Sequence, residues 1–507
     1  MNTAQLAEDS VGRVERAGVE FLPVEARDSS PRNLAVVFVG AGFTLTSAVA
    51  GWLFIGFGLN FWQAVSAGAV GLVIGTAVVV PTALIGPRTG TNMTVASSAD
   101  FGIRGRFIGS VLSLLIALLF AALTVWTSGD ALVAASSRLL GTPDTGVAHA
   151  ASYAVVAAGM AVVALYGHAT IVAVQKLVAP VVGAVMVVGF FVFSSTFDAT
   201  SSTGQYALGD LWPSWILAVV FTAAAPISYA PTISDYTRRI SPARYKDRSI
   251  VGALAIGLLA GGLIPIVFGA YTASATVGST SSGYVSGLVM SAPSWYVAGI
   301  VLMALLGGVG QGVLCIYASG LDIEGLLPRL KRVHTTAITA ALAVALLYLG
   351  VFVFDAADSV STMSVVLNTM VTPWAVIMII GLVRRRHTGY DTDDLQVFAA
   401  ARTGGIYWYS GGWNVDAVLA WVIGSAFGVL TVTTPTYVGP LAGIAGGIDL
   451  STLGSGCVAG LCLIALSARV RRRSDRVGES KPELRIDEGG SHLEQSGGVG
   501  RLRQPLS

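Results

Sequence analysis

WILAVVFTAAAPISYAPTISDYTRR, residues 215–239, is the stretch of this sequence that decides the fold. Its first eleven residues form an apolar run of the kind that fills a helix inside a membrane. Pro226 and Pro231 then interrupt the run, and each proline removes a backbone donor from the helix. In lipid, the freed backbone groups must bind protein groups or face a water-filled cavity. We therefore expect a broken helix that lies inside a bundle and borders a cavity; the alternative is a simple proline kink.

The composition is that of an integral membrane protein. Of the 507 residues, 54% are hydrophobic and only 11% are charged, whereas a soluble domain carries about 25% charged residues. A helix needs roughly 20 apolar residues to cross a bilayer, and about twelve stretches come close to that length. They predict an all-α integral membrane protein with twelve transmembrane helices. The stretches are residues 33–57, 62–86, 107–135, 151–166, 171–195, 213–235, 250–275, 293–320, 336–354, 360–383, 415–434 and 452–468.

Positive charges mark one side of the predicted topology. With the N-terminus placed inside, every Lys and Arg except Arg138 falls in a cytoplasmic tail or loop or at the inner end of a helix. Cytoplasmic loops of membrane proteins show this excess of Lys and Arg. We therefore expect a multi-pass protein of the cell (plasma) membrane with both termini cytoplasmic. Its parts are an N-terminal tail (1–32), a transmembrane domain (33–468) and a C-terminal tail (469–507), which has too little apolar content to fold and is predicted to be disordered.

A second interruption lies in the first predicted helix, FVGAGFTLTSAVAGW (residues 38–52), where glycines and hydroxyl residues cluster. The first and sixth helices hold corresponding places in two repeats of five helices. Paired interruptions of this kind indicate a binding site at the membrane midplane of an inverted-repeat transporter. We therefore expect a five-plus-five inverted repeat with discontinuous helices 1 and 6. Repeat one covers about 33–195, repeat two about 213–383, and helices 11 and 12, about 415–468, lie outside the repeats.

Five motifs, read in order, resemble one family. They lie before helix 2, after helices 2, 6 and 8, and before helix 11, and together they resemble the nucleobase:cation symporter-1 family, also called the purine-cytosine permease family, over about 33–435. The resemblance implies twelve helices in a sodium/leucine-transporter-type fold, and import of a small planar heterocycle driven by H⁺ or Na⁺. The motifs are GLNFWQAV (58–65), GPRTGTNMTVASSADFG (86–102), ISYAPTISDYTRR (227–239), IYASGLDIEGL (316–326) and GGIYWYSGGWNVDAVLAW (404–421).

The resemblance also implies a substrate site between helices 1, 3, 6 and 8. The rings of Phe120 and Tyr229 suit the two faces of a planar base, and the amide of Gln311 can both donate and accept at its polar edge. Members of the family often carry Trp and Asn or Gln at the positions of Phe120 and Thr124, so this pocket is expected to be less polar than usual. The residues implied for the site are Gly40, Gly42, Phe120, Thr124, Ser228, Tyr229, Gln311 and Cys315.

Each of these residues also has a structural interpretation. Phe120 can be an ordinary core aromatic, and Gln311 can hydrogen-bond a neighbouring helix because an amide in an apolar span needs a partner. Cys315 can be a packing residue that happens to line the site. The glycine run GGVGQG (307–312) is interpreted as a close helix–helix contact.

The predicted function is a secondary active transporter that imports a nucleobase, such as a purine or cytosine, by cation symport with alternating access. Allantoin, a hydantoin, a nucleoside or a pyrimidine vitamin precursor is the alternative substrate. A channel would show a filter loop or rings of charge, and a membrane-embedded enzyme would show a nucleophile–base set or metal spacing; neither pattern occurs in the spans. We expect no enzyme activity, metal, cofactor, nucleic acid or obligate protein partner. The partners are the heterocycle, the coupling cation and membrane lipid.

H⁺ is favoured over Na⁺ as the coupling cation. Sodium prefers hard oxygen ligands, and in sodium-coupled relatives of this fold helix 8 supplies hydroxyl side chains just before the first amide position. Here that segment is Gly307-Gly308-Val309-Gly310, which carries no side-chain oxygen. Asp130 in helix 3 is the candidate proton acceptor, because an acidic residue within a membrane span is a functional candidate. Its alternative is a solvated carboxylate near the end of the helix.

Overall fold

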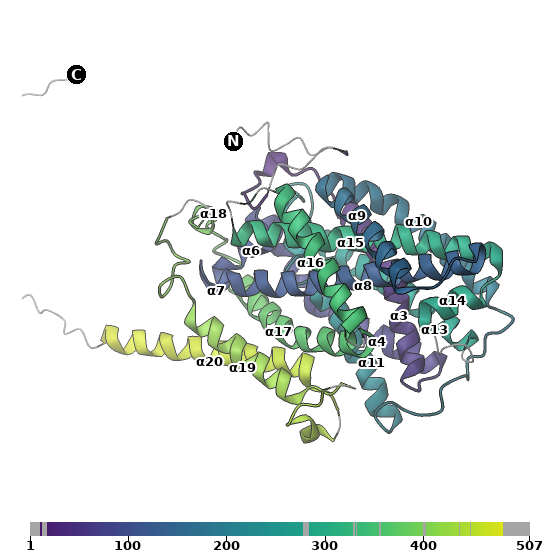
Figure 1. Ribbon diagram of the computed structural model, residues 1–507. Coiled ribbons are helices and arrows are strands. Elements are labelled where there is room, and N and C mark those ends of the chain that lie inside the picture. Colours follow the sequence, from purple (N-terminus) through teal and green to yellow (C-terminus); the bar gives the residue numbers. More distant parts are fainter. Residues whose placement is uncertain are drawn as a thin grey trace, which may run out of the picture. The chain divides into compact units, whose positions relative to one another are not determined.

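The computed structural model is built almost entirely of helices (Figure 1). It describes residues 11–12, 18–276, 283–327, 330, 332–353, 356–398, 402–434, 437–446 and 448–479. Within these ranges the only β-contacts are isolated bridges, such as the one between Ser29 and Ile240. The chain divides into a unit that ends at Leu463 and a second unit that begins at Ile464.

Every predicted apolar stretch coincides with one helix or with consecutive helices. In the described part of the chain, nine helices are long and apolar enough to cross a membrane, or ten if a bent pair counts as one span, and two further apolar helices are shorter. The all-α, multi-pass prediction is therefore confirmed. The helices are α2 (Pro31–Gly42), α3 (Leu45–Gly56), α4 (Phe61–Val79), α8 (Arg106–Leu140), α9 (Gly146–Leu165), α10 (His168–Val192), α11 (Leu211–Ser228), α13 (Asp247–Ala275), α15 (Ser294–Leu326), α16 (Arg332–Val353), α17 (Ala356–Arg384), α19 (Val415–Thr431) and α20 (Ser451–Glu479).

Shorter helices fill the connections. The 3₁₀ helix η2 (Val80–Leu84) and α5 (Ile85–Thr89) continue α4, and α12 (Ile233–Thr237) follows α11. The others are η1 (Val24–Ala26), α6 (Met93–Ala96), α7 (Ser98–Phe101), α14 (Tyr284–Ser291), α18 (Thr392–Leu395) and η4 (Ala442–Ala445).

The first interrupted stretch bends sharply. α2 ends at Gly42, α3 begins at Leu45, and the two axes differ by 56°. Thr44 starts the second helix, because its hydroxyl accepts a 2.9 Å hydrogen bond from the backbone N–H of Ser47. Gly42 allows a close approach: a Cβ there would overlap the backbone of Gly261 on α13. The cluster of glycines and hydroxyl residues thus produces the bend and the tight packing around it.

The second interrupted stretch ends α11 at Ser228 and resumes as α12 at Ile233. Pro226 lies in the last turn of α11 and Pro231 lies in the connection, so two backbone donors are missing within six residues. The Ser228 hydroxyl donates to the carbonyl of Ala225 at 2.7 Å, which satisfies one acceptor near the break.

Close helix contacts explain the glycine run on α15. α15 packs most extensively against α8, and α13 packs against α2 and α3. A Cβ on Gly307 would lie 2.5 Å from the carbonyl oxygen of Phe43, and one on Gly312 would overlap the sulfur of Met160. The packing interpretation of this run is therefore confirmed.

Three exposed tryptophans mark one end of the spans. Trp62, Trp212 and Trp295 are each about two-thirds exposed, and each lies in the first turn of a spanning helix. Tryptophan is enriched where a membrane meets water. The arginine-rich loops lie at the opposite ends of two of these helices, since Arg88 is at the end of the span that begins with α4, and Arg238 follows α12. We call the end with these arginines the basic face.

The N-terminal segment from Gly18 to Ser30 packs on the basic face. The backbone N–H of Leu22 donates to the carbonyl of Gly90 at 2.8 Å, and that of Ser29 donates to the carbonyl of Arg239 at 3.0 Å. The Arg27 guanidinium, which is 3% exposed, donates to the carbonyl of Pro87 at 2.7 Å. Much of the predicted tail, residues 1–32, is therefore a packed segment.

At the other end of the chain, α20 continues past Arg469, where the disordered tail was predicted to begin, and ends at Glu479. Residues 480–507 of that predicted tail lie outside the described residues.

Candidate functional site

A cavity of about 180 Å³ lies where the two interrupted stretches meet α8, α13 and α15. Its lining is mainly apolar and aromatic, with ten hydroxyl-bearing residues and one amide. A pocket of this kind binds a small ligand by its apolar faces and orients it with few polar groups. Both breaks contribute, since Gly42 and Ser47 come from the α2–α3 stretch and Pro226 and Thr232 from the α11–α12 stretch.

Six of the eight residues predicted from the sequence line this cavity. They come from four different helical stretches, separated by as many as 273 residues in the chain, which only folding brings together. These residues are Gly42, Phe120, Ser228, Tyr229, Gln311 and Cys315.

The other two predicted residues face elsewhere. Gly40 packs against α10, and a Cβ at this position would overlap the amide oxygen of Gln175. Thr124 is fully buried, and its hydroxyl donates to the carbonyl of Phe120 at 2.7 Å, one turn earlier in the same helix. Thr127 lines the cavity from α8 in its place.

Gln311 joins the cavity to the first break. Its amide oxygen accepts a 3.1 Å hydrogen bond from the hydroxyl of Thr44, the residue that starts α3. The Gln311 side chain makes no other hydrogen bond to the described residues, so its amide N–H₂ group is available to a ligand in the cavity. The sequence left two interpretations of Gln311 open, a hydrogen bond to a neighbouring helix and a place in the site. The Gln311 side chain has both.

Aromatic side chains form much of the wall. The ring of Tyr229 meets the ring of Phe38 edge to face, with centroids 5.1 Å apart, and Phe38 contacts Tyr236 in the same way at 5.6 Å. Phe120 and Trp126 line the cavity from α8. The sequence pointed to Phe120 and Tyr229 but missed Phe38 and Trp126, because nothing in an apolar run distinguishes a cavity aromatic from a core one.

A hydroxyl pair also lines the cavity. The hydroxyls of Thr46 on α3 and Thr127 on α8 are 2.8 Å apart and hydrogen-bond across the two helices. Thr46 belonged to the hydroxyl cluster that marked the first break, whereas Thr127 had no signal of its own.

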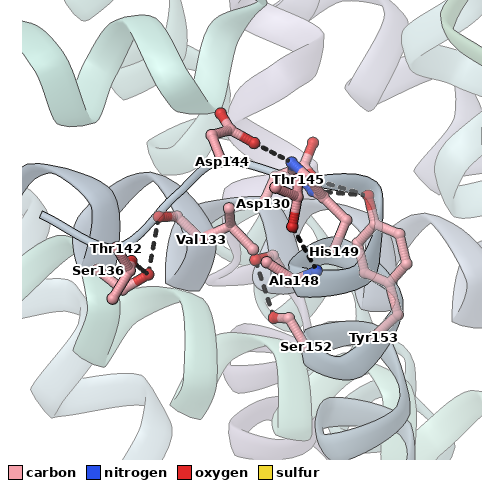
Figure 2. A network of polar contacts seen from close by, with 11 residues as sticks. Asp130, Val133, Ser136, Thr142, Asp144, Thr145, Ala148, His149, Ser152 and Tyr153 are labelled. Atoms are coloured by element: carbon pink, nitrogen blue, oxygen red, sulfur yellow. Dashed lines mark hydrogen bonds and ion pairs between the residues drawn. The ribbon is translucent and has the colours of Figure 1, made fainter.

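Asp130, the candidate proton acceptor, lies in a separate polar network between α8 and α9 (Figure 2). One carboxylate oxygen of Asp130 is 2.9 Å from Nδ1 of His149 and accepts a 2.7 Å hydrogen bond from the hydroxyl of Tyr153. The other ring nitrogen of His149 is 2.9 Å from the carboxylate of Asp144. None of these residues lines the cavity.

The carboxylate of Asp322 lies next to the cavity wall. Ser113, which lines the cavity from α8, donates from its hydroxyl to a carboxylate oxygen of Asp322 on α15. Asp322 was not predicted as a site residue, because the eighth span was predicted to end at residue 320, whereas α15 continues to Leu326.

Comparison with known proteins places the chain in a family. Residues 21–453 match the family described as "Permease for cytosine/purines, uracil, thiamine, allantoin". The chain belongs to this family. A Bacillus subtilis protein named "Putative purine-cytosine permease YxlA" is 24% identical to this permease over 91% of its chain and 98% of the relative.

Solved structures of one transporter share the fold. Mhp1, a nucleobase-cation-symport-1 family transporter, in a closed conformation with bromovinylhydantoin bound, aligns with a TM-score of 0.71 and 20% identity over 90% of this permease and 96% of Mhp1. Its inward-facing conformation aligns with a TM-score of 0.67 and 19% identity over 92% and 95% of the two chains. The fold of this permease is therefore similar to that of Mhp1.

Proposed function

We propose that this permease is a secondary active transporter that imports a nucleobase, or a related small planar heterocycle, by cation symport with alternating access. The observation that carries the proposal is the cavity between the two interrupted helices, with aromatic walls and the amide of Gln311. Helix breaks at the midplane expose backbone groups to a substrate and allow one bundle to move against the other.

The proposed substrate contacts follow from the chemistry of the wall. The rings of Phe120 and Tyr229 offer faces or edges to a planar ring. The Gln311 amide group donates to a carbonyl or ring nitrogen of the substrate. Gly42, Ser228 and Cys315 complete this proposed set and contribute mainly space and shape. A substrate with one polar edge and two apolar faces suits this arrangement best.

We also infer the finer architecture from the same features. Ten spans and two shorter apolar helices are consistent with twelve transmembrane helices in a five-plus-five inverted repeat, with helices 1 and 6 discontinuous. The basic face would be cytoplasmic, with both termini on that side, because Lys and Arg concentrate in cytoplasmic loops. The location would be the cell membrane, where lipid surrounds the exposed apolar helix faces.

H⁺ is the proposed coupling cation. α15 offers no side-chain oxygen between Gly307 and Gly310, and the carbonyl of Gly310 already accepts a 2.7 Å hydrogen bond from Gln175. Carbonyl groups near Phe43 would be the remaining ligands for Na⁺.

Transport by the purified protein in proteoliposomes tests the proposal. Radiolabelled cytosine, purines, uracil, allantoin and a hydantoin are each supplied under an imposed pH gradient or an imposed sodium gradient. We expect one of these compounds to accumulate above its external concentration under the pH gradient. Equilibration without accumulation under either gradient would indicate a channel, and no uptake or exchange of any heterocycle would refute the proposal.

A further inference from the structure

A buried carboxylate separates the cavity from the basic face. Asp322 on α15 is 1% exposed. Its two oxygens accept hydrogen bonds from hydroxyl groups: Thr94 of α6 donates to one at 2.9 Å, and Ser113 of α8 donates to the other. Among the described residues, no cationic side chain forms an ion pair with Asp322.

A second carboxylate shares this site. Asp235 of α12 is also 1% exposed, and one of its oxygens accepts a 3.0 Å hydrogen bond from the backbone N–H of Met93. Met93 and Thr94 are neighbours in α6, so the same turn holds both carboxyl groups, and the charge of Asp235 acts on Asp322. Because both carboxyl groups are buried and are bonded from one turn, a proton shared between them would relieve the repulsion of two negative charges.

Other charged groups on the neighbouring segments have partners of their own. Arg238, directly after α12, donates to the carbonyl of Gly18 at 2.6 Å, and Arg239 lies 3.7 Å from the carboxylate of Asp28. Arg106 of α8 donates to the carbonyl of Gly325 at 2.9 Å, and its guanidinium lies 4.1 Å from the ring centre of Phe398. Glu324 of α15 points toward the backbone of Gly18 in the N-terminal segment. α6 carries no charged residue, and His334, near the start of α16, is exposed. Among the described residues, two hydroxyl groups donate to Asp322, and the charge of Asp235 acts on it.

A hydroxyl group connects this carboxylate to the cavity. Ser113 lines the cavity, and its hydroxyl proton is directed at Asp322. When a hydronium ion in the cavity gives a proton to the Ser113 oxygen, the original hydroxyl proton can pass to Asp322. The serine is then unchanged, the carboxylate becomes a carboxylic acid, and a water molecule remains in the cavity.

We propose that the Asp322–Asp235 pair binds the proton that is transported with the substrate. This inference rests on the proposed function and assigns its coupling site. The pair lies where α6, α8, α12 and α15 meet, so a change in its charge alters the hydrogen bonds that hold these elements together. Protonation from the cavity and release toward the basic face would then accompany the two halves of the transport cycle. In this proposal Asp130, whose carboxylate binds His149 and Tyr153 away from the cavity, takes no part in coupling.

Asp322→Asn tests the proposal, because the amide resembles the protonated acid and retains an acceptor for Thr94. Proteoliposomes are given a pH gradient of about one unit, which supports up to about tenfold accumulation when one proton moves with each substrate molecule. We expect about tenfold accumulation for the wild-type protein and a ratio near one for Asp322→Asn. Counterflow exchange, which needs no net proton movement, should persist in the variant. Asp130→Asn is the matched control and should accumulate substrate like the wild type.

Ser113→Ala provides a second variant, since it removes the hydroxyl bridge and leaves both carboxylates in place. We expect slower accumulation under the pH gradient with counterflow retained, and this result would support the proposal even if Asp322→Asn did not fold. Three results would overturn the proposal. The first is accumulation by Asp322→Asn at the wild-type level. The second, if Asp322→Asn does not fold, is full coupling in Ser113→Ala, and the third is loss of coupling in Asp130→Asn alone.

Failure of this inference and failure of the proposed function give different results. If the wild-type protein accumulates a heterocycle under a sodium gradient and ignores the pH gradient, the transport function stands and the proton site is refuted. If the wild-type protein neither accumulates nor exchanges any heterocycle, the proposed function itself fails.

Discussion

Replacement of Gln311 by leucine tests the substrate site most directly. Leucine keeps much of the size of glutamine and removes both the donor and the acceptor. A lost hydrogen bond that leaves a buried partner unsatisfied costs about 1–3 kcal/mol. This cost corresponds to an increase in the substrate Kd of roughly fivefold to over a hundredfold.

The structure also indicates what the substitution leaves intact. Thr44 would lose its acceptor on Gln311, but its hydroxyl also lies 3.1 Å from the hydroxyl of Ser47 and still accepts from the Ser47 backbone N–H. The break between α2 and α3 should therefore persist, and most of the effect should appear in substrate affinity.

Gln175→Leu is the matched control. Gln175 is also a buried amide in a spanning helix, and it donates to the carbonyl of Gly310 on α15 at 2.7 Å, but it does not line the cavity. The same substitution there should lower the unfolding temperature and leave the Kd unchanged. The Kd of each variant is measured by equilibrium binding of the transported heterocycle to the purified protein. An unaltered Kd in Gln311→Leu, or equal weakening in both variants, would refute the proposed contact.

Three further experiments test other parts of the structure. Replacing Pro226 and Pro231 together by alanine should let α11 continue and abolish transport while the protein still inserts; uptake with an unchanged apparent affinity would favour a simple kink. Arg385→Ala leaves the buried carboxylate of Asp100, 2.6 Å from the guanidinium, without its ion pair, and should destabilise the protein by about 3–5 kcal/mol. The unfolding temperature should recover when Asp100→Asn is added, and no recovery would contradict the pairing argument. Arg27→Ala should loosen the N-terminal segment and increase labelling of Cys315, the cysteine in the cavity, by an impermeant maleimide added at the basic face. Unchanged labelling would show that Arg27 does not keep this segment packed on the basic face.

The apolar helices could be predicted from the sequence because they depend on local chemistry. Apolar length determines a span, and prolines or clustered glycines determine where it breaks. It was harder to predict which residues of α8 line the cavity. Thr124 and Thr127 are three residues apart in a helix that is apolar on most faces, and only its packing against neighbouring helices decides which hydroxyl lines the cavity.

Asp322 was missed for a different reason. A carboxylate at residue 322 and another at residue 324 resemble the end of a span, so the predicted helix stopped at residue 320. The hydroxyl partners that allow the helix to continue with this acid buried, Thr94 and Ser113, are more than 200 residues away in the chain. Contacts between segments so distant leave no local pattern in one sequence.

The N-terminal segment has a consequence for the biogenesis of the protein. The ribosome makes Ser29 before Arg239, which lies beyond the second break and whose carbonyl accepts a hydrogen bond from the Ser29 backbone N–H. At synthesis rates of about 5–20 residues per second, that partner appears roughly 10–40 s later. During this interval the segment has no complete docking surface, and any chaperone or protease at the ribosome meets it exposed. The covering of the basic face is thus completed only when a segment made much later reaches it.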